Sequence, residues 1–184
     1  MNANHLAFCD STFDIALSGF MGWYDCFDFI NFQFTQPDTK AREIWRVLKD
    51  GGKLVCCSWE QQEDVAWMEE AFIRHYPAIL QHPEFIENRT IGMAYEKAAG
   101  YEIILRSAGF REIETVQESM VFVSTDEEEW WRQMDELGWF IIMDKIDPAE
   151  LQRIKAAVFQ DLQHFKQADG IHFQKTVFFV RGVK

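Results

Sequence analysis

Basic residues and long hydrophobic runs are both scarce in this chain of 184 residues. The 18 Lys and Arg residues are outnumbered by 30 Asp and Glu residues, which gives a formal net charge of −12. A surface of that sign repels phosphate backbones and anionic lipid headgroups. No apolar run approaches the roughly 20 residues that cross a bilayer, and the N-terminus lacks the basic and apolar regions of a signal peptide. We therefore expect no nucleic-acid partner, no membrane partner and a cytoplasmic location.

The ligand patterns of metal sites are missing as well. The four cysteines include no pair at the two-residue spacing of zinc sites. Cys56 and Cys57 are adjacent, so on a strand their side chains point to opposite faces. The five histidines are scattered, without the spacing of a metalloprotease motif. We predict no metal site.

Apolar and aromatic residues are plentiful, at 48% and 15% of the chain, which is enough for the core of one domain over residues 1–184. An apolar strand is predicted at Phe13 to Phe20 and a second at Lys53 to Trp59. Between them, an amphipathic helix is predicted from Thr35 to Asp50, ending at Gly51-Gly52. Strand, helix and strand with short joints predict a parallel crossover in an α/β fold.

The second half of the chain continues this alternation of helices and strands. Start and stop signals predict a helix near Val65 to His75 and another that ends at Gly109. Two further helices are predicted to begin near Thr125 and at Asp147-Pro148. The remaining strands are predicted at Ile113 to Val123 and at Ile171 to Val180.

Two stretches carry a resemblance to a known family. The segments "LAFCDSTFDIALSGF" and "AREIWRVLKDGGKLVCCSW" resemble the central motif pair of class I S-adenosylmethionine-dependent methyltransferases that act on small molecules. Phe13-Asp14, the helix residues from Glu43 to Lys49 and Gly51-Gly52 stand at the matching positions. The later "LRSAGFREIETV" resembles the joint before the sixth strand of that family.

The resemblance implies a truncated Rossmann-like sheet. The family's strand order is 3-2-1-4-5-7-6, and this chain resembles the C-terminal portion that starts just before the fourth strand. We therefore expect strands equivalent to 4-5-7-6, with the last strand antiparallel and helices on the faces. Residues 1–123 and 171–184 would form the partial methyltransferase core, and residues 124–170 a helical lid insertion.

The resemblance also implies S-adenosylmethionine as the cofactor of the family. Relatives hold it with a glycine-rich turn after the first strand and an acidic residue after the second. None of the ten glycines forms such a turn. We therefore expect that this chain alone does not bind the cofactor, although the resemblance places remnants of the cofactor site at Asn2, Ala3, Ser18, Gly19 and Phe20. Catalytic residues stay unassigned, because methyl transfer depends mainly on positioning.

Aromatic residues are dense between Phe20 and Phe34, and two interpretations stay open. They form the core, or they line a pocket for an apolar small molecule, closed by the helix that carries Trp130 and Trp131. The residues proposed for the pocket are Trp23, Tyr24, Phe27, Trp59, Trp130 and Trp131. The alternative to a methyltransferase part is a non-enzymatic dimeric remnant that binds an apolar molecule in this pocket.

The fourth-strand equivalent "FDIALSGF" would lie at an edge of the truncated sheet. An edge strand with few charges exposes unpaired backbone groups and apolar side chains, which favours association. We expect a homodimer, formed either through this edge or through the segment from Phe20 to Phe34.

Overall fold

The computed structural model describes residues 2–83, 85 and 96–184. Residue contacts divide the chain into two compact units. The first comprises Met1–Gln61, Ala94–Glu118 and Thr176–Lys184, and the second comprises Gln62–Met93 and Ser119–Lys175. The division falls within three long strands, which are β4 (Leu48–Gln62), β5 (Arg111–Ser124) and β7 (Gly170–Val183). Whether the chain is one domain with an inserted lid stays a prediction, and each unit is described by itself.

The sheet has the strand order β1-β4-β7-β5, and the short β6 (Lys166–Gln167) pairs with β7. Strand β1 (Phe13–Gly19) runs parallel to β4, with Ala16 beside Leu54. The backbone N–H of Gly51 donates to Lys184 over 3.1 Å, and Lys184 donates to Gly52 over 2.9 Å. The end of β7 therefore lies beside the start of β4, so these strands are antiparallel. The strand order expected from the resemblance, 4-5-7-6 with an antiparallel last strand, is confirmed.

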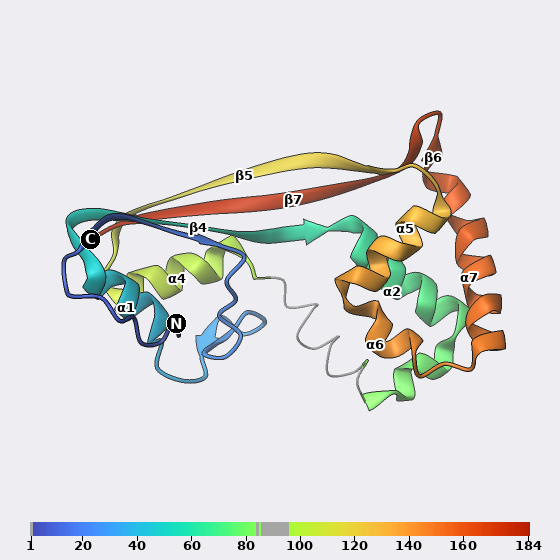
Figure 1. The fold of residues 1–184 in the computed structure, drawn as a ribbon, viewed down its shortest axis with the longest axis horizontal. Coiled ribbons are helices and arrows are strands. Elements are labelled where there is room, and N and C mark those ends of the chain that lie inside the picture. Colours follow the sequence, from blue (N-terminus) through green and yellow to red (C-terminus); the bar gives the residue numbers. More distant parts are fainter. Residues whose placement is uncertain (1, 84, 86–95) are drawn as a thin grey trace. The chain divides into compact units, whose positions relative to one another are not determined.

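Two helices of the first unit, α1 (Lys40–Val47) and α4 (Ala98–Ala108), lie on the same side of the strands (Figure 1). Helix α4 ends at Gly109, whose φ of 104° is left-handed as its stop signal predicted. A small hairpin of β2 (Phe27–Asp28) and β3 (Gln33–Phe34) follows β1. Core side chains of these elements pack into one cluster with those of β4 and β7.

Helix α1 is shorter than the helix predicted from Thr35 to Asp50. The helix begins more than one turn after the predicted start at Thr35. The Asp38 carboxylate accepts a hydrogen bond from the backbone N–H of Ala41 at this start. At its end, residues from Leu48 onward belong to β4, because Leu48 pairs with Phe13 in β1. Tertiary strand pairing thus overrides the helical pattern at the C-terminal end.

The second unit is mainly helical. Its helices begin with α2 (Glu63–His75) and η1 (Pro77–Gln81) and continue, between β5 and β7, with α5 (Glu127–Met134), η2 (Asp135–Trp139), α6 (Phe140–Met143), α7 (Pro148–Leu162) and η3 (Gln163–Phe165). Helix α7 starts as predicted, with Asp147 accepting from the N–H groups of Ala149 and Glu150. Helix α5 starts one residue later than predicted, because Asp126 rather than Thr125 accepts from the N–H of Glu129.

The second unit has its own hydrophobic cluster, which includes Met68, Phe72, Trp130 and Val158. Every residue of this cluster belongs to the second unit, and every residue of the other cluster belongs to the first. Among the described residues, no helix has the length and apolar character needed to cross a membrane.

Candidate functional site

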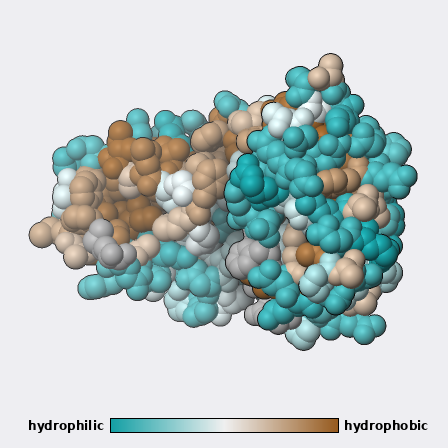
Figure 2. Space-filling view, turned by 45° about the vertical axis from the view of Figure 1, so that its right-hand side comes forward, coloured by the Kyte–Doolittle hydropathy of each residue, from teal (hydrophilic) through white to brown (hydrophobic). Residues whose placement is uncertain are grey.

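A hollow of about 460 Å³ opens beside β1 in the first unit. Its walls come from the N-terminal segment, from β1, from α1 and from Leu54 of β4. The lining residues are Ala3, Leu6, Phe8, Phe13, Ile15, Ala16, Leu17, Ser18, Gly19, Met21, Ile44, Val47 and Leu54. Figure 2 shows an apolar area, drawn in brown, at the left of the view, over the unit that carries β1.

The N-terminal wall of this hollow is held in place by one guanidinium group. Arg46 of α1 donates to the carbonyl oxygens of Leu6 and Phe8, each over 2.9 Å. It also forms ion pairs with Asp10 at 2.6 Å and Glu43 at 2.8 Å. The planar fork of an Arg side chain suits several acceptors at once. Arg46 therefore fixes the segment that carries Leu6 and Phe8 against α1.

Glu43 completes this attachment from the same helix. Its carboxylate accepts a hydrogen bond from the backbone N–H of Leu6 over 2.8 Å. The hydrogen bonds from Arg46, and then that from Leu6, lower the pKa of Glu43 to about 2. The carboxylate therefore stays ionised at neutral pH, and the wall carries a charged attachment behind an apolar lining.

The side chains of the lining are apolar except for one hydroxyl group. Of the thirteen lining residues, Ser18 is the one with a polar side-chain atom. Within the described part of the chain, the buried Ser18 Oγ makes no hydrogen bond to oxygen or nitrogen, and Ser18 pairs in register with Cys56. Burial, followed by the charge of Cys57, raises the pKa of the Cys56 thiol, so it stays protonated. The hollow can hold an apolar group, but it offers no charge.

The structure brings together three of the five residues predicted as remnants of the cofactor site. Ala3, Ser18 and Gly19 line the same hollow. Phe20 follows β1 with a φ of 53°, and its ring packs on that of Trp59 with centroids 5.1 Å apart. The side chain of Asn2 accepts from the backbone N–H of Asn4, so it closes a local turn. Whether any of them contacts a cofactor stays a prediction.

The aromatic residues predicted for a substrate pocket are placed differently. Trp23 and Phe27 are buried in the cluster of the first unit, and none of the six residues lines the hollow. Tyr24 is 41% exposed and packs against Phe29. Trp130 and Trp131 belong to the cluster of the second unit. The packing agrees with the core interpretation of Trp23 and Phe27, and the pocket role of the set stays a prediction.

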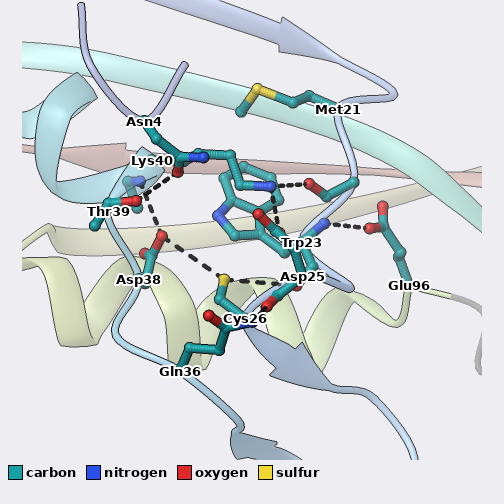
Figure 3. Close-up of polar contacts among 12 residues, drawn as sticks. Asn4, Met21, Trp23, Asp25, Cys26, Gln36, Asp38, Thr39, Lys40 and Glu96 are labelled. Carbon is teal, nitrogen blue, oxygen red and sulfur yellow. Dashed lines mark hydrogen bonds and ion pairs between the residues drawn. The ribbon is translucent and has the colours of Figure 1, made fainter. Parts of the chain in front are cut away.

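Sequence reasoning missed a cluster of polar contacts around Trp23 (Figure 3). The Glu96 carboxylate accepts from the backbone N–H of Trp23 over 2.7 Å and from the Ser58 hydroxyl over 3.0 Å. It also accepts from the Tyr101 hydroxyl. Burial, and then the Glu96 charge, raises the pKa of Tyr101, so its hydroxyl stays protonated and acts as the donor. Glu96 therefore connects the segment after β1, β4 and α4.

A second part of this cluster surrounds Lys40. Its ammonium donates to the carbonyl of Gly22 over 2.5 Å and to Asp25 over 2.6 Å. Cys26 contacts the Asp38 carboxylate, and burial raises the pKa of both side chains, that of Cys26 to about 12. A protonated thiol is a poor nucleophile, so Cys26 is a core residue rather than a reactive one. The sequence signal was weak, because Glu96 and Asp38 stand in no recognisable motif.

Within residues 2–83, 85 and 96–184, no group of three or more His, Cys, Asp or Glu side chains is arranged to hold a metal ion. The polar side chains around Lys40 and around Arg46 are held together by hydrogen bonds and by the ion pairs of these two residues.

Neither a protein-family model nor a curated protein matches this chain. Solved structures similar to it include a protein from Bacillus halodurans described as a methyltransferase, with 18% identity and a TM-score of 0.46. They also include the YcgJ protein of Bacillus subtilis, with 14% identity and a TM-score of 0.47. Both alignments cover 100% of this chain and 69% of the other.

A third similar structure is an S-adenosylmethionine-dependent methyltransferase from Thermotoga maritima, described as a possible histamine N-methyltransferase. The identity is 17% and the TM-score 0.42, over 100% of this chain and 62% of the other. Solved structures similar to this chain thus include S-adenosylmethionine-dependent methyltransferases, the class that the sequence motifs resemble.

Proposed function

We propose that this chain is the C-terminal part of an S-adenosylmethionine-dependent methyltransferase for small molecules, and that it does not hold the cofactor or catalyse by itself. The observation that carries the proposal is the sheet. A parallel β1–β4 pair, followed by antiparallel β7 and then β5, is the order expected for the C-terminal half of that fold. Ligands of such sheets bind at the carboxyl ends of the parallel strands, where Ser18 and Gly19 line the hollow.

The hollow does not fit the complete cofactor. S-adenosylmethionine presents a carboxylate, an ammonium group, a ribose diol and a sulfonium centre, and each needs a polar or charged partner when it leaves water. The lining offers the Ser18 hydroxyl and no carboxylate or basic side chain. In the proposed enzyme, residues outside this sequence would make the polar contacts to the cofactor. This chain would supply the apolar wall at the end of β1.

Substitution of Gly19 tests the proposal. A Cβ atom at Gly19 would lie 3.8 Å from the Cys57 sulfur, which is ordinary contact, so a side chain there projects without strain. We expect the longest polypeptide that the gene encodes to bind S-adenosylhomocysteine in calorimetry and to transfer methyl groups. Gly19→Trp should fill the hollow and abolish binding, whereas the control Val116→Trp on β5 should not. Equal binding by both variants would contradict a cofactor site at the end of β1.

A second candidate function is favoured by the lining itself. A hollow of about 460 Å³ whose lining side chains are apolar except for that of Ser18 has the size and character of a site for an uncharged, mainly apolar molecule. The 184-residue chain would then act as a binding module without a cofactor. An uncharged fluorescent dye such as Nile red tests this candidate, because saturable binding that Gly19→Trp removes supports it. Binding unaffected by that variant contradicts it.

A further inference from the structure

Among the described residues, strand β1 is an edge strand that pairs on one side only. It stands at one end of the sheet order and pairs with β4. The backbone N–H of Phe20 donates to Cys57 in β4, and backbone groups alternate in direction along a strand. Ile15 and Leu17 lie an odd number of positions before Phe20. Their N–H and C=O groups therefore point away from β4. These groups form a template for another strand.

The side chains of this edge are apolar and accessible. Ile15 is 60% exposed and Leu17 is 78% exposed. The one charged residue of the strand, Asp14, already forms an ion pair with Lys49 at 2.9 Å. Edge strands of soluble proteins normally carry lysine, proline or a bulge that blocks further pairing. Strand β1 has neither lysine nor proline, and its irregular register lies between Phe13 and Ile15, ahead of the free segment.

The first part of the opposite edge of the same sheet is protected by charged side chains. Strand β5 stands at the other end of the order, and four charged residues lie in its first eight positions. They are Arg111, Glu112, Glu114 and Glu118. Glutamates at this density repel a second copy of this part of the strand, so the first eight positions of β5 differ from β1 in their capacity for self-pairing.

We propose that a second copy of this chain pairs with β1, as an antiparallel strand related by a two-fold axis at Ala16. This register makes the strand complementary to itself, because position i lies opposite position 32 minus i. Ile15 then lies opposite Leu17 of the other copy, and the reverse pair repeats the contact. Both residues direct their backbone groups to the free side, so each such pair exchanges two hydrogen bonds.

The same register keeps the acidic residues of the two copies apart. Asp14 of one copy lies opposite the neutral Ser18 of the other copy, four residues along the strand from the Asp14 of that copy. At about 3.3 Å per residue, the two carboxylates are about 13 Å apart, beyond the screening length of about 8 Å at physiological salt. Each Asp14 also keeps Lys49 as its ion-pair partner. The Asp14 carboxylates of the two copies therefore do not oppose pairing at this strand.

A two-fold pair at this edge also covers the hollow beside β1. The lining residues Ile15, Ala16 and Leu17 lie at the centre of the proposed seam. Residues that complete a cofactor site at the end of β1 would need the same edge. The dimer is therefore proposed for the 184-residue chain by itself. Its basis is the exposed edge of β1, which does not depend on the proposed methyltransferase function.

Light scattering at tens of micromolar tests the dimer with a matched pair of variants. The wild-type chain should have twice the mass of 21.7 kDa. Leu17→Lys should raise the dimer dissociation constant at least about 100-fold, because two leucines leave the seam and two charges enter it. Val116→Lys places the same charge at a 57% exposed position on the opposite edge and should stay dimeric. A monomeric wild type, or dissociation by Val116→Lys but not Leu17→Lys, would overturn the proposal.

A cross-link tests the register even if a lysine variant fails to fold. In the proposed seam the two Ala16 positions are a non-hydrogen-bonded pair with Cα atoms about 4.5 Å apart, within the range of disulfides. In a Cys9→Ser background, Ala16→Cys should form a disulfide between copies under mild oxidation. Asp14→Cys should not, because its two copies are about 13 Å apart. The reverse result, or no cross-link at either position, would exclude this register.

Discussion

Removal of the Glu96 carboxylate should strongly destabilise the first unit. The side chain is 5% exposed and accepts hydrogen bonds from Trp23, Ser58 and Tyr101. Glu96→Ala leaves the Trp23 N–H and the Ser58 hydroxyl without this acceptor, and Tyr101 keeps only the Met21 carbonyl at 3.2 Å. Each buried unpaired group costs about 1–3 kcal/mol. Because water enters part of the space, we expect a loss of about 3–5 kcal/mol rather than the full sum.

Two graded variants separate the carboxylate from its neighbours. Tyr101→Phe removes one donor and should cost about 1–2 kcal/mol. Glu96→Gln keeps one acceptor oxygen but turns an amide N–H₂ toward the remaining donors, so its effect should lie between the other two. Urea unfolding followed by circular dichroism measures all three against wild type. A Glu96→Ala variant within 0.5 kcal/mol of wild type, a margin of about the size seen for ordinary surface changes, would refute the reasoning.

Three further predictions concern packing, capping and pH. Gly100→Ala should destabilise by about 1–3 kcal/mol in spite of its better helix propensity, because its Cβ would lie 2.5 Å from the Phe29 ring, and thermal unfolding measures the sign. Asp147→Ala should cost about 0.5–2 kcal/mol by removing the cap of α7, whereas Asp147→Ser should restore most of it in the same assay. Glu43 should titrate near pH 2. Its hydrogen bond from the Leu6 N–H is therefore fully present above the usual pKa of 4.5 and is lost as the pH falls toward 2. An NMR titration of Glu43 with a midpoint near 4.5 would contradict this.

Most element positions could be predicted because their signals are local, whereas the strand order was expected from the family resemblance. Continuous apolar runs predicted β1 and the part of β4 from Lys53 to Trp59, and Gly109 and Asp147 marked helix boundaries. The predicted end of α1 was wrong because Leu48 pairs with Phe13 of β1. These residues are 35 positions apart in sequence, so no local pattern indicates the contact.

The candidate site was predicted only in part for the same reason. Ala3, Ser18 and Gly19 were named from a motif resemblance, and they line one hollow. The wall that encloses it depends on Arg46 reaching the backbone of Leu6, a contact across 40 residues. Glu96 likewise bonds Trp23 across 73 residues. Such long-range polar contacts are set by the packed fold and not by spacing in the sequence.

Titration of S-adenosylhomocysteine into the purified 184-residue chain tests the central claim most directly. The hollow at the end of β1 provides one hydroxyl and no charge, so the account predicts no saturable heat up to millimolar ligand, where the binding free energy would be about −4 kcal/mol. A dissociation constant near 1 μM, about −8 kcal/mol, would contradict it, because the chain would then supply the polar contacts that the account assigns to residues outside this sequence.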